Sequence, residues 1–207
     1  SPSGDVRNAR LALRRQDPAA AGGAGLPFDY DLEAELAGLE VAKADGSAAV
    51  RGLSASVRAD SRSVRLDLAS RATIVEWPEL LRAPLELREL TGIVVWRQGQ
   101  DALRVVSDGL VVATPDATLR SDLELTLPRD GSSPLLDLQT SVSAFDVAAV
   151  KRYLPQGKLP PPVFAWLDRA LAGGRVHEAD VTLFGELAAF PFDDGGGEFT
   201  AVARVEN

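Results

Sequence analysis

The chain has 207 residues, of which 45% are hydrophobic and 25% charged, so it can bury a sizeable core and its composition argues against disorder. Its formal net charge is −8, with 22 basic residues scattered among 30 acidic ones, which argues against nucleic acid or an anionic membrane surface as a partner. No apolar run approaches the roughly 18 residues of a membrane span, and the lack of Met suggests a segment of a longer protein whose anchor could lie outside it.

Alternating apolar and polar residues predict antiparallel strands over most of the chain. Asp5 to Leu13 is expected as an edge strand, and 17–27 as a flexible connection. Phe28 to Leu36 alternates between an apolar and an acidic face, as a half-buried strand does. Turn signals at 45–46, 98–101, 107–109, 115–117 and 129–134 separate most of the further strands, which are expected at 48–57, 63–68, 85–90, 92–97, 102–106, 110–113, 119–127, 135–142, 176–185 and 198–205.

Two stretches break this alternation and predict helical structure. In the first, 74–81, the sequence WPELL predicts one helical turn before Pro84 restores an extended chain. The second, 145–175, predicts two short helices joined by an elbow, with Asp146 as N-cap and with Phe145 packing on Val150. Lys151 and Arg152 suit the last turn of its first helix. A sheet followed by a short helical stretch thus occurs twice, which we interpret as a weak internal repeat.

Catalytic and metal sites find little support. His177 is the only histidine and Cys is absent, which excludes Ser/His/Asp triads, multi-histidine metal sites and thiolate sites. The glycine-rich stretch 193–198 fits a hairpin turn better than a calcium loop. The acidic row Asp29, Asp31, Glu33 and Glu35 fits a solvated strand face. We therefore predict no enzyme activity, no cofactor and no metal.

Strand periodicity alone leaves two architectures open. A sandwich would bury two apolar faces against each other. One strongly twisted sheet curled into a groove would instead leave an apolar lining open to a ligand.

Several motifs occur in order between Pro27 and the C-terminus, among them WPELLRAPLELRELTGIVVW, RYLPQGKLPPPVFAWLDRALAGGRV and FPFDDGGGEF. Their order and spacing resemble the central region of the AsmA-like YhdP family. The resemblance implies a mainly β fold, a twisted antiparallel sheet curled into an elongated groove that holds acyl chains, with two or three short helices. It also implies a periplasmic segment of a protein that is anchored in the inner membrane and moves phospholipid towards the outer membrane.

With this resemblance, the chain divides into an edge strand with a flexible connection (1–27), a β-groove segment (28–144), a helical elbow (145–175) and further groove strands (176–207). The expected partners are phospholipid and neighbouring segments of the same long chain. Alternation predicts that Arg65, Asp67, Asp122, Glu124 and Asp137 face solvent. The residues expected to line the groove are Leu66, Leu68, Val94, Trp96, Leu103, Val105, Leu123, Leu125, Leu136, Leu138 and Phe199.

Phe164, Trp166 and Leu167 are candidates for a lip of the groove, although packing of a helix onto the sheet is the simpler interpretation. Two further hypotheses stay beside lipid transfer. One is a structural spacer that holds an envelope assembly at a set length without binding lipid. The other, a segment that spans the outer membrane, is weakened by the predicted helices and by only 2 Tyr and 3 Trp.

Overall fold

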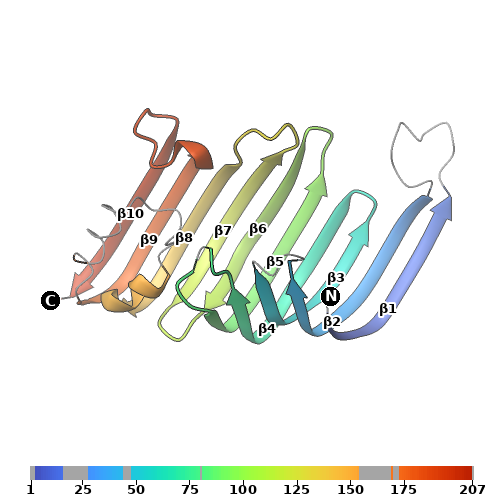
Figure 1. Cartoon of the computed structure of the whole chain (residues 1–207), viewed down its shortest axis with the longest axis horizontal. Helices are drawn as coiled ribbons and strands as arrows, with labels where there is room; N and C mark the ends of the chain where they lie inside the picture. The colour runs from blue at the N-terminus through green and yellow to red at the C-terminus, as the bar shows by residue number, and fades with distance from the viewer. Residues whose placement is uncertain are drawn as a thin grey trace.

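The computed structural model describes residues 3–15, 28–43, 48–79, 81–153, 169 and 173–206. Within these ranges ten strands form one antiparallel sheet, in which each strand pairs only with its neighbours in sequence (Figure 1). The elements are β1 (Ser3–Arg15), β2 (Phe28–Ala42), β3 (Ala49–Asp60), β4 (Ser63–Glu76), β5 (Leu85–Gln98), β6 (Ala102–Ala113), β7 (Thr118–Pro128), β8 (Leu135–Asp146), the 3₁₀ helix η1 (Val147–Arg152), β9 (Arg175–Glu186), the 3₁₀ helix η2 (Leu187–Ala189) and β10 (Gly197–Glu206).

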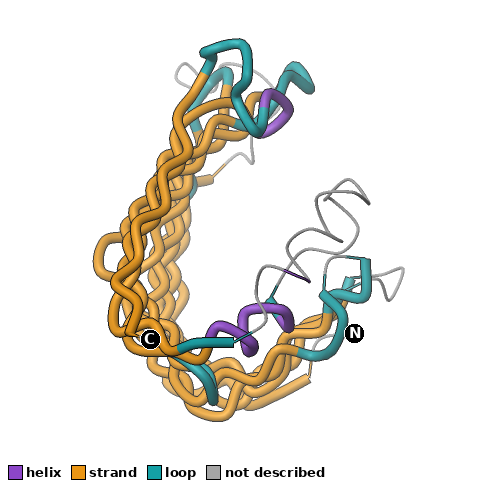
Figure 2. The backbone as a smooth tube through the Cα atoms, turned by 90° about the vertical axis from the view of Figure 1, so that its left-hand side faces the viewer, coloured by secondary structure: helices purple, strands orange, loops and turns teal. Residues whose placement is uncertain are grey.

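The sheet is strongly curved. Viewed from the side, the strands trace an open arc, and η1 lies on its inner side (Figure 2). No second sheet covers this concave face among the described residues. The predicted fold class, a mainly β chain whose single antiparallel sheet curls into a groove, is therefore confirmed, and the sandwich alternative is wrong.

Residues with positive φ lie within the strands, where β-bulges bend the sheet. One such residue lies in each of the five strands from β2 to β6, and these residues are Gly38, Gly52, Ala72, Gly92 and Gly109. Pairing shifts register beside most of them, as β-bulges do, and a bulge bends its strand and increases the local twist. Position 92 also requires a residue without a side chain, because a Cβ there would lie 2.9 Å from the Cα of Leu110.

Polar side chains bind the backbone groups that this bend leaves without ladder partners. The Ser70 hydroxyl accepts from the N–H of Ser54 and donates to its carbonyl, each at 2.8 Å. Ser107 donates to the Ile93 carbonyl at 2.7 Å, and the N–H of Gly109 donates to an Asp122 carboxylate oxygen at 2.6 Å. Because buried backbone groups without partners are costly, these contacts stabilise the curved form of the sheet.

The predicted cap of the first elbow helix is confirmed. Oδ1 of Asp146 accepts from the N–H of Ala148 at 2.8 Å, and Lys151 and Arg152 lie in the last turn of η1. The stretch around Trp77 forms one hydrogen-bonded turn, closed by the N–H of Leu81 to the carbonyl of Trp77 at 2.7 Å. No helix among the described residues is long and apolar enough to cross a membrane.

Three predicted boundaries are wrong. The expected strands 85–90 and 92–97 form the single strand β5, and β4 continues to Glu76 instead of ending near Leu68. The expected turn at 107–109 is a β-bulge within β6, so 102–106 and 110–113 also form one strand. In β5 and β6 a glycine that favours a turn, Gly92 or Gly109, supplies the φ of a bend rather than a reversal, and in β4 Ala72 has the positive φ. The connection 17–27 and the turn at 45–46 lie outside the described residues.

Candidate functional site

The orientation of β8 identifies the concave face. Leu136, Leu138, Thr140 and Val142 alternate along this strand without a register shift, so they share one face. Val142 lines a pocket together with Ala149, which belongs to η1. Because η1 lies inside the arc in Figure 2, this face of β8 is the concave one.

Register carries this assignment across the sheet, because directly paired residues on neighbouring strands share a face. Two rows of mainly apolar residues follow. The first row consists of Ala34, Val57, Leu66, Val94, Ser107, Leu123, Leu138, Leu183 and Phe199. The second row consists of Leu11, Leu32, Ala59, Val64, Trp96, Val105, Leu125 and Leu136, and it ends at Gly185 and Gly197.

The residues predicted to line the groove lie together on this concave face. Nine of them belong to the two rows, and Leu68 and Leu103 alternate in register with row members on β4 and β6. The structure thus places all the predicted lining residues on one surface. The candidate lip residues Phe164, Trp166 and Leu167 lie outside the described residues.

Hydroxyl groups on the concave face already have partners. The Ser121 and Thr140 hydroxyls lie 2.9 Å apart and share a hydrogen bond, and the hydroxyl of Ser107 donates to backbone. These side chains therefore need no polar ligand, and the surface behaves as apolar.

The convex face carries paired charges. Arg58 lies 3.6 Å from Glu33, Arg65 lies 2.8 Å from Asp67, and Arg104 lies 3.2 Å from Glu124. Since exposed pairs of this kind contribute only about 0–1 kcal/mol each, their main effect is to keep the convex face hydrated. Among the described residues, no cluster of three or more His, Asp or Glu side chains could hold a metal ion.

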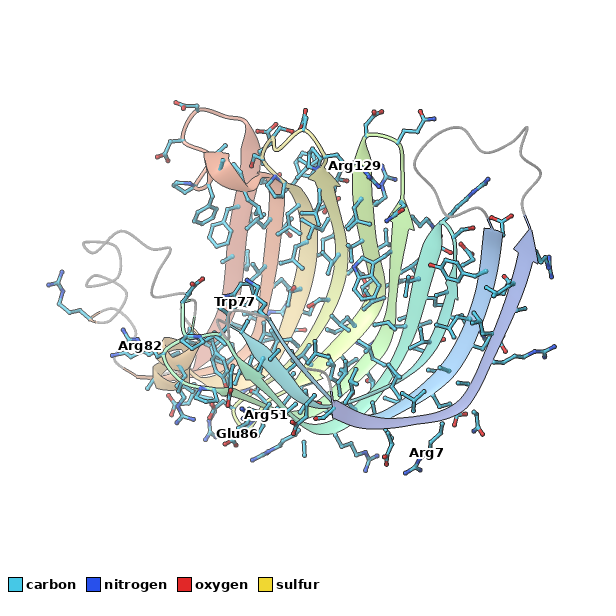
Figure 3. The ribbon with its side chains drawn as sticks, turned by 45° about the vertical axis from the view of Figure 1, so that its right-hand side comes forward. Arg7, Arg51, Trp77, Arg82, Glu86 and Arg129 are labelled. Atoms are coloured by element: carbon cyan, nitrogen blue, oxygen red, sulfur yellow. The ribbon has the colours of Figure 1, made fainter. Side chains whose placement is uncertain are left out.

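Pockets lie at both ends of the concave face. At the upper end, in the orientation of Figure 1, Trp96, Leu103, Tyr30 and Val64 line a pocket of ≈ 290 Å³ beside the turn 60–63. At the lower end a pocket of ≈ 410 Å³ lies between the sheet and η1. In Figure 3, Trp77 and Arg82 mark the connection beside this lower end, whereas Arg129 marks the upper one.

The lower pocket was missed by the sequence prediction. Its walls include Val112, Leu119 and Val142 from the sheet and Val150 from η1. Extending the alternation Leu136, Leu138, Thr140 by one step reaches Val142, and so the strand pattern held this signal. No pattern in the sequence indicates that η1 folds back over these strands.

A family model described as YhdP protein matches residues 1–207. A curated relative, the Intermembrane phospholipid transporter YhdP of Escherichia coli (strain K12), is 21% identical over 128 residues, or 62% of this chain. The matched region spans 10% of that relative's length. No solved structure is significantly similar to this chain.

Proposed function

The chain belongs to the YhdP family, and from this premise we propose that it is a segment of a lipid-transfer protein of the cell envelope. In this proposal its concave face carries the acyl chains of phospholipids between the inner and the outer membrane. The segment lies in the periplasm, belongs to a protein anchored in the inner membrane, and performs no chemical reaction.

One observation carries the proposal: among the described residues, no second sheet covers the apolar rows on the concave face. Leu66, Val94, Leu123 and Leu138 follow one another across adjacent strands, so the apolar surface is continuous across the sheet. A spacer would need only a closed core, whereas an uncovered apolar surface of this extent is typical of a binding site.

The energetics of transfer agree with such a surface. At about 0.8 kcal/mol per buried CH₂, a dozen methylene groups contribute roughly 10 kcal/mol without any directional contact. An acyl chain bound in this way can slide, because no single hydrogen bond must break. The curated relative is named a phospholipid transporter, which supports phospholipid as the cargo.

The two edges of the sheet suggest how the groove continues. Among the described residues, β1 and β10 each pair on one side only. Long unpaired edges expose rows of N–H and C=O groups that favour a further strand. The proposal therefore includes neighbouring segments of the same long chain as partners at both edges, so that the apolar rows extend beyond this segment.

Site-specific photo-crosslinking in cells tests the proposal with adjacent pairs. A photoreactive residue at Leu66 or Leu138, on the concave face, should capture phospholipid. The same residue at the neighbouring positions on the convex face, Asp67 or Asp137, should not. Equal labelling of both members would refute the groove, and a purified chain that carries no lipid in native mass spectrometry would favour the spacer.

A further inference from the structure

The lower pocket is built from three parts of the chain. The floor is formed by Val112, Leu119 and Val142 of the sheet, and the roof by Ala149 and Val150 of η1. Leu81 and Leu85 close one side. Its volume of ≈ 410 Å³ falls within the roughly 300–1,000 Å³ of sites that hold small molecules.

The polar atoms at one end of this pocket are already paired. The Tyr153 hydroxyl lies 2.7 Å from Oδ2 of Asp116 and 3.0 Å from Oγ1 of Thr114. Arg152 donates to the same Asp116 oxygen at 3.0 Å, and Thr114 Oγ1 also accepts from the N–H of Ala117 at 3.0 Å. A polar ligand would have to break these bonds, so the pocket favours an apolar occupant.

The pocket is also the end of the groove along the strand direction. On β8, Leu136 and Leu138 line the open concave face, and Val142 lines the pocket. The four residue steps from Leu138 to Val142 span about 13 Å, at roughly 3.3 Å per residue. One leaflet of a bilayer has a hydrocarbon depth of about 15 Å, half of the ~30 Å core. An acyl chain that lies along β8 from Leu138 therefore reaches the pocket.

From this geometry we infer that the lower pocket holds the methyl end of one acyl chain. The inference rests on the proposed function and adds a fixed binding depth to it. A lipid seated here points its hydrocarbon end towards η1 and its ester groups towards the upper end of the groove. The segment then holds a lipid in one orientation, whereas a uniform apolar surface would accept either orientation.

Photoreactive phospholipids test this orientation. The chain is incubated with phosphatidylcholine vesicles that contain a diacyl phospholipid bearing a diazirine on one acyl chain, either at the methyl end or beside the ester. The methyl-end probe should label peptides that contain Leu119, Val142 or Ala149, whereas the ester-side probe should label peptides of the upper end, such as the one with Trp96. If both probes label the pocket peptides equally, or neither labels them while the concave face is labelled, the inference is wrong and the proposed function stands. If neither labels the concave face at all, both fail.

A pocket-filling variant provides a second, independent test. Ala149→Trp places an indole in the pocket, because the Ala149 side chain is 8% exposed and lines it. Its matched control is Ala148→Trp, one residue earlier in η1 on an exposed side chain. Ala149→Trp should abolish methyl-end labelling of the Leu119 and Val142 peptides, and Ala148→Trp should retain it. Methyl-end labelling of these peptides that survives in a folded Ala149→Trp chain overturns the inference. If this variant does not fold, the labelling of the wild-type chain by the two probes tests the inference by itself.

Discussion

The ring of Phe192 occupies the space that a side chain at Gly185 would need, since its Cε1 atom lies 2.6 Å from the position of a Cβ there. The same ring lies 2.5 Å from a Cβ position at Gly197. The second apolar row ends at these two paired glycines, so the connection 187–196 folds back and covers its end. Phe190 packs edge-on against both Phe192 and Phe199, with ring centroids 5.7 and 5.6 Å apart.

Phe192→Ala should therefore destabilise this end of the sheet. Phe192 is 7% exposed, and removal of a buried phenyl ring typically costs about 3–5 kcal/mol. Phe184→Ala is the control, because Phe184 is 48% exposed and should cost below about 1 kcal/mol. Chemical denaturation measures the free energy of unfolding of both variants. Similar decreases in the two would contradict a buried packing role for the Phe192 ring.

Ala72→Gly should stabilise the chain. Ala72 has φ 57, a left-handed conformation that costs a residue with a Cβ roughly 1–2 kcal/mol. Glycine also lowers stability by about 0.5–1 kcal/mol, because it gives the unfolded chain more conformational freedom. The expected net gain in folding stability is therefore about 0.5–1 kcal/mol. Ala69→Gly, at an exposed position of the same strand without positive φ, should instead destabilise. A loss of stability in Ala72→Gly would show that this residue does not hold the bend as described.

Tyr153 should make stability depend on alkaline pH. Burial, and then the hydrogen bond to Asp116, raise the pKa of Tyr153 above its ordinary value of 10.0. Since the raised pKa belongs to the folded state, the stability that the neutral hydroxyl provides is complete below pH 10.0. It is lost as the pH rises through the higher folded pKa.

The test compares wild type with Tyr153→Phe in urea at about pH 8 and about pH 11. At the lower pH the variant should be less stable by about 1 kcal/mol, because it lacks the hydrogen bond to Asp116. At the higher pH the difference should shrink. A constant difference across this range would mean that the hydroxyl is hydrated in the folded chain.

Leu125→Asp should separate lipid binding from folding. Leu125 belongs to the second row on the open concave face, where a carboxylate can still reach water, so the chain should fold. A passing acyl chain would have to desolvate this charge, which costs at least several kcal/mol, so most co-purifying lipid should be lost. Thr126→Asp, the next residue on the opposite face, should retain lipid. A folded Leu125→Asp chain with normal lipid content would argue against transport across this row.

Strand alternation predicted which residues share a face because it is a local property. Leu123 and Leu125 must share a face whatever the sheet does, and their pairing with Leu138 and Leu136 follows from a hairpin of regular length. The choice between sandwich and groove depended on long-range geometry, which the resemblance supplied and periodicity did not.

The bend and the lower pocket escaped prediction for a physical reason. A glycine such as Gly92 or Gly109 is compatible with a chain reversal and with a bulge within a strand, because both conformations need positive φ. The sequence therefore does not distinguish the two. Contacts with the neighbouring strand favour the bulge. The Ser107 hydroxyl donates to the Ile93 carbonyl, a contact between residues distant in sequence that strand periodicity does not reveal. The position of η1 over Val142 is likewise a tertiary contact without a sequence period.

Because the strands pair in strictly sequential order, the stability of the sheet depends mainly on interfaces between neighbouring strands. Because each strand of the described sheet pairs only with the strand before and the strand after it, cooperativity passes from neighbour to neighbour, as in solenoid repeats. Amide exchange should accordingly be slowest in the middle strands and become faster towards β1 and β10. Duplicating or deleting one hairpin would change the length of such an array while leaving the remaining interfaces intact, and so a family built this way can adjust its reach without inventing a new fold.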